Sequence, residues 1–468
     1  MTTRSRSRSI AAVVLSLVTT CPVSFSASTA WADATRCGET VEDLQQLNDA
    51  IADFIARPAC THIELGEDIL IREDVSGVQP IQPIVGGSFE APELINRSLV
   101  IEGNGFTLTG ESDIPGFVIY LAAPNTSHTL TIRNLGMSGF GGSGAVSVVS
   151  GATVIERSLF TNNTFQLASL IPGLEDASAG AINAIGGLVV TESQFEGNTG
   201  FEGGAIHNSP TLVPQLVPTG AALPPVQIIG STFADNEAST AGGAIHALQP
   251  LAMSNSTVTG NSGGSAGALN VDGTIFLDYC TIVENSSVSN RAAVSASGNI
   301  GITNSIIYGN PFDPTGPTAG FADVAADGTV SVTSSLLTAS DSITSTLYTT
   351  VLDDSNIVGE DPMLSPLGDF GGFALPGGAT IQTRSPQKGS PVIDQLELIA
   401  AGNGDRPRDQ RGTGFPRFVN GRADMGAVEY WPDLVPEPPT DLMNPIPDFN
   451  EFPFSLNLER LTHLPDTR

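Results

Sequence analysis

The feature that most constrains this chain is a sequence repeat with a period of about 24 residues, which is too short for a propeller blade or a helix pair. From residue 130 onwards, an apolar residue recurs just before a small turn that ends in Asn. Aliphatic residues recur five and seven positions before it, and a small residue, mostly Ser, recurs two positions before it. The aligned apolar residues are Met137, Phe160, Phe195, Phe233, Val258, Ile282, Ile307 and Leu337.

The polar member of the repeat stands three positions after this apolar residue. It is Asn in most units: Asn163, Asn198, Asn236, Asn261, Asn285 and Asn310. Units with strand-like alternation bury their apolar face by stacking, which places equivalent residues one rung apart, roughly 4.8 Å. Stacked amides can then hydrogen-bond along the column. We therefore expect an all-β fold, a right-handed parallel β-helix (solenoid) whose hand follows the usual crossover chirality, with these Asn residues as a structural ladder.

A short helix is expected before the repeats. Residues 40–56 place apolar side chains at helical spacing, with Thr40 as the expected N-cap. These apolar residues are Leu44, Leu47, Ile51, Phe54 and Ile55. Because the open end of a solenoid must be shielded, this segment predicts a capping α-helix over the first coil.

The N-terminus carries a pattern typical of secretory signals. Arg4, Arg6 and Arg8 precede an apolar stretch over residues 10–18, and Ala30-Trp31-Ala32 follows as a small-residue cleavage site. We expect export to the bacterial cell surface or the medium, with a lipoprotein attached through Cys21 as the alternative. No later segment has about 18 uninterrupted apolar residues, so no transmembrane segment is expected after the signal.

The remaining cysteines have structural interpretations. Cys37 and Cys60 flank the predicted helix, and in an oxidising compartment we expect a disulfide between them, with two unpaired buried thiols as the alternative. Cys280 takes the small-residue position of the repeat, where a free Cys acts as a compact buried group.

The charge balance excludes several partners. With 19 basic and 49 acidic side chains, the net charge is -30, so a nucleic-acid partner is not expected. The repeats hold too few basic groups for a lyase that must neutralise a uronate, and the adjacent Asp353 and Asp354 are interpreted as a turn. We assign no catalytic residue, no metal site and no cofactor; calcium is the one ion that the acidic surface leaves open.

The sharpest candidate site follows a second motif, Gly-Ala-aliphatic, in successive units. The next position holds Asn183, His207, His246 and Asn270. If the aliphatic residue points inward, alternation sends this column outward, with two imidazoles on adjacent rungs. Such a face could bind a glycan or a metal ion, or supply acid–base chemistry. A polar stack that only continues the repeat is the competing interpretation.

The repeat resembles a known family. Phe160-Thr161-Asn162-Asn163 and Phe195-Glu196-Gly197-Asn198, alternating with Gly203-Gly204-Ala205-Ile206, are similar to the F-x-x-N and G-G-A-I repeats of polymorphic outer-membrane proteins. Those proteins are bacterial surface β-helix passengers associated with adhesion, so the resemblance implies a surface role. Their C-terminal membrane barrel has no recognisable counterpart here, and the mode of attachment is not carried over.

A second resemblance covers residues 367–430, which are similar to the choice-of-anchor Q domain of exported β-helix proteins. It rests on four segments: Gly368–Gly372, Gly389–Asp394, Asp409–Gly412 and Gly421–Glu429. The region is rich in basic residues, which we interpret as paired with Asp405, Asp409, Asp424 and Glu429 and not as a cationic patch. The basic residues are Arg384, Lys388, Arg406, Arg408, Arg411, Arg417 and Arg422.

Together these patterns predict a signal peptide (1–32), an N-terminal capping helix segment (33–62), a parallel β-helix (63–366), a closing segment (367–430) and a Pro-rich acidic tail (431–468). The expected function is a non-catalytic structural, adhesive or glycan-contacting role, with glycans or cell-surface components as partners. The alternative is a carbohydrate-active enzyme, either a polysaccharide lyase or a glycoside hydrolase, acting around His207 and His246.

Overall fold

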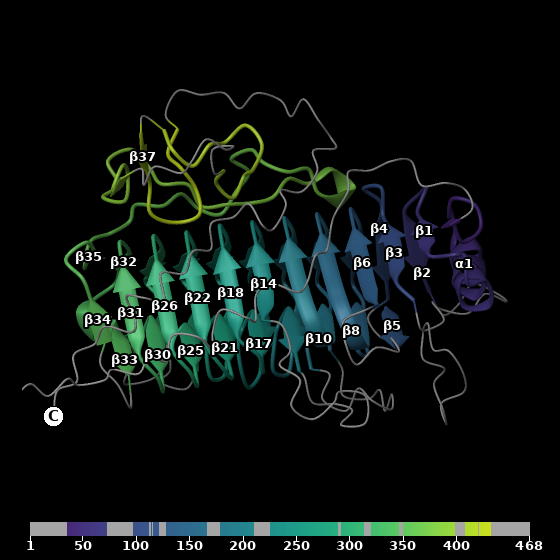
Figure 1. The fold of residues 1–468 in the computed structure, drawn as a ribbon, viewed down its shortest axis with the longest axis horizontal. Coiled ribbons are helices and arrows are strands. Elements are labelled where there is room, and N and C mark those ends of the chain that lie inside the picture. The colour runs from purple at the N-terminus through teal and green to yellow at the C-terminus, as the bar shows by residue number, and fades with distance from the viewer. Residues whose placement is uncertain are drawn as a thin grey trace, which may run out of the picture. The chain divides into compact units, whose positions relative to one another are not determined.

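Short parallel strands dominate the computed structural model, with one α-helix near the N-terminal end (Figure 1). The structure describes residues 35–72, 97–111, 114, 116–120, 128–165, 178–209, 225–288, 292–312, 320–345, 350–397, 408–419 and 421–431, all within the compact unit Asp33–Pro438. The predicted signal peptide, residues 166–177 and 210–224, Arg406 with Asp405, and the tail after Trp431 lie outside the described residues.

The largest sheet consists of two rows of strands joined through the long strands β8 (Val146–Glu156) and β10 (Ile182–Thr191). Besides these two, row A contains β5 (Phe117–Tyr120), β13 (Ile206–Asn208), β17 (Ile245–Ala247), β21 (Leu269–Val271), β25 (Val294–Ala296), β30 (Val324–Ala326) and β33 (Ile343–Ser345). Row B contains, with β8 and β10, β1 (His62–Glu64), β3 (Leu99–Glu102), β6 (Thr129–Arg133), β14 (Val226–Ile229), β18 (Leu251–Ser254), β22 (Ile275–Asp278), β26 (Ile300–Thr303), β31 (Val330–Thr333) and β34 (Thr350–Leu352).

Two further sheets complete the stack. Row C is the 11-stranded sheet of β2 (Ile69–Ile71), β4 (Thr107–Gly110), β7 (Gly136–Ser138), β9 (Leu159–Thr161), β11 (Gln194–Glu196), β15 (Thr232–Ala234), β19 (Thr257–Thr259), β23 (Thr281–Val283), β27 (Ile306–Tyr308), β32 (Leu336–Leu337) and β35 (Ile357–Val358). Row D is the 6-stranded sheet of β12 (Thr199–Gly200), β16 (Glu237–Ala238), β20 (Ser262–Gly263), β24 (Ser286–Ser287), β28 (Pro311–Phe312) and β29 (Gly320–Phe321). Short 3-10 turns lie at Ser340–Ser342 and Pro376–Gly378, and β36 (Leu396–Glu397) pairs with β37 (Arg422–Ala423).

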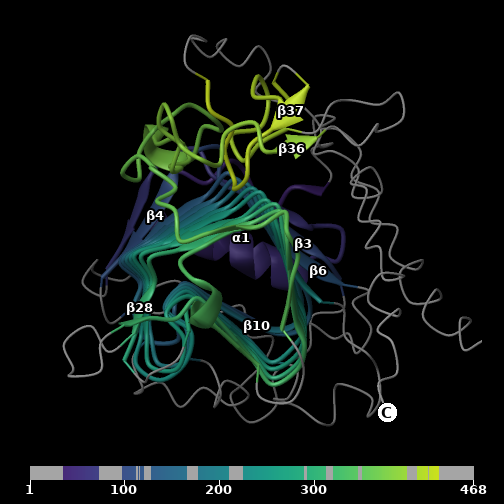
Figure 2. The ribbon, with the colours of Figure 1, turned by 90° about the vertical axis from the view of Figure 1, so that its left-hand side faces the viewer.

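From β12 to β28, the chain passes through rows A, B, C and D in turn before it returns to row A. Strands β13 to β16 make one such circuit, and β17 to β20 pair with them in parallel. The register is the one that the sequence columns predict, for example Phe195 opposite Phe233 and Phe233 opposite Val258. Viewed from the end, successive circuits superpose around a common interior (Figure 2).

The interior is filled by the apolar columns of the repeat. Phe160, Phe195 and Phe233 are fully buried, and their rings stack with centroids 5.0 and 4.8 Å apart and planes within 3° of parallel. Burial of such side chains contributes on the order of 2 kcal/mol each relative to exposure, repeated on every rung. Stacking in one column therefore explains why the same residue type recurs at the same position.

The six Asn residues form a continuous, buried hydrogen-bond ladder. In each step, the Oδ1 atom of one Asn accepts from both the backbone N–H and the Nδ2 group of the Asn one rung before, as Asn236 does for Asn198 at 3.0 and 2.9 Å. The same Nδ2 groups also donate to backbone carbonyls in row C, such as Asn236 to Phe195 at 3.0 Å. Since buried amides must be satisfied, each rung requires an Asn on the next.

The ladder ends on a residue that the repeat pattern does not identify. Asn310 donates to the carboxylate of Asp323 at 3.0 Å, not to the aligned Ser340. Asp323 is fully buried and also accepts from the Thr338 backbone and from the Ser342 hydroxyl. Burial raises the pKa of Asp323, while these hydrogen bonds lower it. A carboxylate can accept without donating, so it suits the last position of a chain of donors.

The small-residue column forms a second ladder. Backbone N–H groups donate to the hydroxyl oxygen one rung on, from Ser158 to Ser193, from Ser193 to Ser231 and from Ser231 to Ser256. Cys280 takes its place in this column with a thiol instead of a hydroxyl, and its own N–H donates to the Ser305 hydroxyl at 3.0 Å. Ser recurs at this position because its small hydroxyl accepts a hydrogen bond from a buried backbone N–H group of the preceding rung.

The capping helix is shorter than the sequence predicts. Helix α1 spans Leu44–Ala56, and its N-cap is Asp43, whose side chain accepts from the Gln46 N–H, so the expectation of a Thr40 cap is wrong. Val41 is instead extended and bridges Leu65, which prevents helical backbone before Asp43. The helix buries Leu44, Leu47, Ala50, Ile51 and Phe54 against the first strands, whereas Ile55 is exposed.

The cysteines follow the predicted pattern. Cys37 and Cys60 form a disulfide that ties the segment before α1 to the segment after it. Cys280 is a free, fully buried thiol, and burial raises its pKa to about 12.

The closing segment lies along the outer face of row C, not over the end of the stack (Figures 1 and 2). Gln410 donates to the Thr232 hydroxyl at 2.7 Å and to the Ser231 carbonyl, while Ala427 donates to the Thr281 hydroxyl at 2.9 Å. A second apolar cluster joins Val392 and Met425 to the outward side chains of β23, β27 and β32. These strands of row C are therefore covered on both faces, whereas Leu70 on β2 and Val358 on β35 are exposed.

Four of the basic residues that the structure describes in this segment form ion pairs, two of them with the carboxylates that the sequence predicts as partners. Arg411 forms a two-pronged contact with Asp409, and the fully buried Arg417 contacts Glu429. Arg384 pairs with Glu284 and Arg422 with Glu397. These four arginines therefore do not form a binding patch for polyanions.

Within the described residues, no helix is long and apolar enough to cross a membrane.

We predict that Asn236→Ala lowers the free energy of unfolding by about 3 kcal/mol, because it removes four buried hydrogen bonds and leaves the Asn198 N–H unsatisfied. The matched control is the exposed Asn299→Ala, for which we expect a change within about 1 kcal/mol. Urea unfolding followed by circular dichroism measures both. Equal losses in the two variants would show that the ladder is not a special source of stability.

We predict that a chain that begins at residue 33 shows no thiol reactive towards Ellman's reagent when folded, because Cys280 is buried and the other cysteines are paired. Unfolding without reductant exposes the Cys280 thiol alone, and unfolding with reductant adds Cys37 and Cys60. Detection of all three thiols without reductant would contradict the disulfide.

Candidate functional site

The predicted polar column is present in row A. Ser147, Asn183, His207, His246, Asn270 and Ser295 are register partners on consecutive strands from β8 to β25. His207 and His246 are therefore immediate neighbours, one on β13 and one on β17.

The column does not form the open outward face that alternation predicts. His207 is 3% exposed and His246 is 9% exposed, and Asn183 is buried as well. The turns that precede these strands pack closely against one another and against the column. A Cβ atom on Gly204 would lie 2.1 Å from the Gly243 carbonyl oxygen, so only glycine permits this approach. The expectation of an exposed face is therefore wrong, and tight turn packing is the reason.

Asn183 is engaged by its own turn. Its Oδ1 atom accepts from the backbone N–H groups of Ser178 and Ala179, both at 2.8 Å. Its Nδ2 group donates to the carbonyls of Ser143 at 2.8 Å and Ala179 at 3.0 Å. Both N–H groups and both acceptor positions of the Asn183 amide are thus used by the protein itself. Asn183 therefore anchors the turns, and its side chain is not free to bind a ligand as predicted. Asn270, beside His246 on β21, is only half-buried.

The two histidines converge on a residue that sequence reasoning missed, Glu202. The Oε2 atom of Glu202 lies 3.3 Å from Nδ1 of His207 and 3.4 Å from Nδ1 of His246. Glu202 lies in the turn between β12 and β13, its side chain is 35% exposed, and the Ser178 hydroxyl donates to the same oxygen. These three side chains form a group whose ligand-type atoms lie within 4.8 Å of one another.

The electrostatics keep both imidazoles neutral near neutral pH. Burial, with the His246 side chain adding to it, lowers the pKa of His207 to about 3. Burial also lowers the pKa of His246, against the opposing charges of Glu202 and Asp272. A neutral imidazole keeps a lone pair, which makes the pair suited to metal ligation or to hydrogen bonding and not to charge pairing.

One signal in the sequence could have identified Glu202. It stands directly before Gly203-Gly204-Ala205-Ile206, and the equivalent position of the next repeat is Ala241. A carboxylate in a position otherwise held by a small residue, five residues before a histidine, is a local departure from the repeat.

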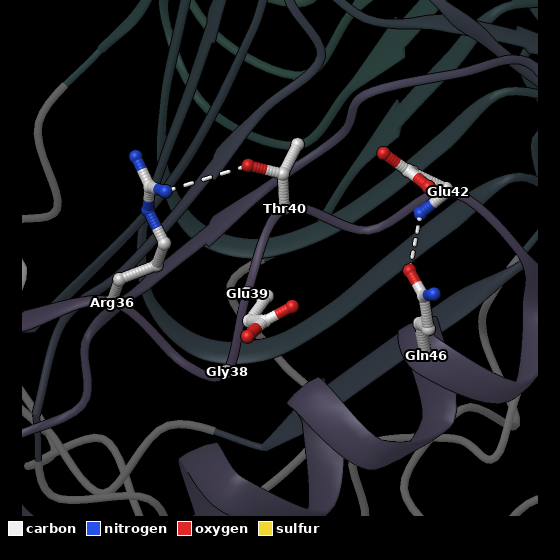
Figure 3. A pocket seen from close by; sticks show the side chains of 6 residues that line it. All are labelled: Arg36, Gly38, Glu39, Thr40, Glu42 and Gln46. Carbon is white, nitrogen blue, oxygen red and sulfur yellow. Dashed lines mark hydrogen bonds between the residues drawn. The ribbon is translucent and has the colours of Figure 1, made fainter.

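A depression lies beside the N-terminal cap and is shown in Figure 3. Its polar groups serve the local structure: Arg36 pairs with Glu64 and donates to Thr40, and the Gln46 side chain accepts from the Glu42 N–H. The depression is lined by Arg36, Gly38, Glu39, Thr40, Glu42 and Gln46. It is therefore a weaker candidate than the histidine pair.

In comparisons with protein families, curated proteins and solved structures, the chain matches none of them.

We predict that Asn183→Ala destabilises the protein by about 3 kcal/mol, because two buried backbone donors and two carbonyls lose their partner. Asn270→Ala, in the same column but half-buried, serves as the matched control with an expected change below about 1 kcal/mol. Thermal unfolding distinguishes them. A stable Asn183→Ala variant would contradict the anchoring role.

Proposed function

We propose that this chain is an exported, right-handed parallel β-helix that serves as a non-catalytic structural and binding scaffold at the cell surface or outside the cell. The observation that carries the proposal is the use of the repeat's polar side chains by the stack itself. The Asn ladder, the Ser ladder and Asn183 all hydrogen-bond within the protein. In these repeats, the regularly spaced polar side chains hydrogen-bond to neighbouring strands and turns of the same chain. This use of polar side chains suits a rigid structural support.

The closing segment supports a choice-of-anchor Q-like interpretation, because contacts join all four motif segments. Arg411 donates to the carbonyls of Phe370 and Glu429, and Glu429 donates its N–H to Asp409. Asp394 donates its N–H to the carboxylate of Asp424. In this proposal, the four motif segments pack together as one unit against row C. The resemblance to surface β-helix proteins rests on this unit.

The charge distribution favours neutral glycans or proteins as partners over polyanions. The chain is strongly acidic, and arginines of the closing segment are paired with carboxylates. The alternative, a carbohydrate-active enzyme around His207 and His246, requires these imidazoles to reach a sugar, and their burial disfavours it.

The first test concerns activity. Incubation of the purified chain with neutral and acidic polysaccharides, with and without calcium, should yield neither reducing ends nor unsaturated products above a heat-inactivated control. Sedimentation with insoluble glycans or whole cells should retain the chain. Product formation that disappears in the double variant His207→Ala/His246→Ala would replace the scaffold proposal with the enzyme.

The second test concerns export. Expression of the full chain in a bacterial host, followed by fractionation and N-terminal sequencing, should recover a protein that begins at Asp33 outside the cytoplasm. Recovery of a chain that begins at Met1 in the cytoplasm would contradict export.

A further inference from the structure

The histidine pair departs from the stacking that its position favours. Rings on adjacent rungs elsewhere lie flat on each other, as Phe195 and Phe233 do with planes 1° apart. His207 and His246 have a similar centroid spacing, 5.1 Å, but their planes differ by 57°. The Nδ1 atom of each ring lies within 3.4 Å of the Glu202 carboxylate oxygen. The arrangement is therefore organised around the carboxylate and not around ring stacking.

The contacts to Glu202 do not satisfy the imidazoles. Neither Nδ1 atom has a hydrogen-bond partner, and His207 lacks one at Nε2 as well. The His207 side chain is only 3% exposed, so water does not replace these partners. Leaving a buried polar atom without a partner destabilises the folded state, so a group that joins these atoms would stabilise the protein.

The two distances that join Glu202 to the histidines match edges of a tetrahedron around a small cation. Zinc binds imidazole nitrogen at about 2.0–2.1 Å and carboxylate oxygen at about 2.0–2.2 Å, so two ligands of one tetrahedral ion lie about 3.3–3.5 Å apart. The two measured oxygen–nitrogen distances are 3.3 and 3.4 Å. An aligned N–H···O hydrogen bond would instead be about 2.7–3.2 Å long.

We propose that Glu202, His207 and His246 bind one divalent transition-metal ion, with Zn²⁺ as the best match, through Oε2 and the two Nδ1 atoms. Two nitrogens and one oxygen favour such an ion over calcium, which takes six to eight oxygen ligands. Three protein ligands leave a fourth position for water. Since the Glu202 side chain is partly exposed, the ion can reach the site from solvent on that side.

The ion would connect two coils. His207 lies on β13 and His246 on β17, and the chain between them makes a complete circuit of the stack. Bound metal would hold adjacent coils together in row A, as the Asn ladder holds them at the corner before row D. This role goes beyond the proposed scaffold function, and a failure of metal binding would leave the scaffold proposal unaffected.

The test uses the chain that begins at residue 33, freed of metal with EDTA. Titration with Zn²⁺ in a calorimeter should give one site per chain, and Co²⁺ should develop the visible absorption of a tetrahedral complex. Zinc should also raise the thermal unfolding midpoint, because an ion that binds the folded state stabilises it. Glu202→Gln and His246→Gln should each weaken binding at least tenfold, and excess calcium should not displace the zinc.

The matched control is Glu237→Gln, which removes an exposed carboxylate of the neighbouring coil and should leave zinc binding unchanged. If His246→Gln does not fold, Glu202→Gln decides, because its side chain is partly exposed. The proposal is overturned by the absence of a saturable site, by unchanged affinity in Glu202→Gln, or by displacement of zinc by calcium, which would indicate binding to the acidic surface.

Discussion

The buried Asn ladder is the interaction on which the rest of the structure depends. Each amide is removed from water, so each must find its donors and acceptors on the neighbouring rungs. A shift of one coil by a single residue would break the ladder and turn the apolar columns outward at the same time. The ladder therefore couples the register of row C to the closure of each circuit. Asp323 ends the series because a carboxylate needs no further acceptor.

The closing segment shows how the repeats acquire a second buried face. Strands β15, β19 and β23 are buried on both sides, since Gln410, Val392 and Met425 cover the face that would otherwise meet solvent. The threonines of this face are hydrogen-bond partners of the covering segment, as Thr232, Thr257 and Thr281 show. The buried Arg411 and Arg417 support the covering loops from within, through contacts with Asp409 and Glu429.

The same rung spacing supports two different chemistries. In row C it stacks the rings of Phe160, Phe195 and Phe233, which adds only apolar contact. In row A it brings His207 and His246 together, where the turn carboxylate of Glu202 reaches both. Repetition thus turns one substitution in each of two units into a pair of adjacent ligands, without any change in the backbone. A stack of parallel strands can gain a site in this way while its ladders preserve the fold.

The repeat in the sequence by itself determined the parallel stacking, the apolar columns, the Asn positions and the adjacency of His207 with His246. These features depend on a period and on alternation, which are properties of the linear chain. The capping helix and the Cys37–Cys60 pairing also follow from local spacing, although the helix begins later than predicted because Val41 pairs with Leu65. Only the tertiary structure decided that the histidine column is buried, that Glu202 joins it, that Asp323 ends the ladder and that residues of the closing segment cover row C. Each of these features depends on where a turn or a distant segment packs. Contacts between parts of the chain that do not repeat produce no periodic pattern in the sequence, so the sequence pattern does not predict them.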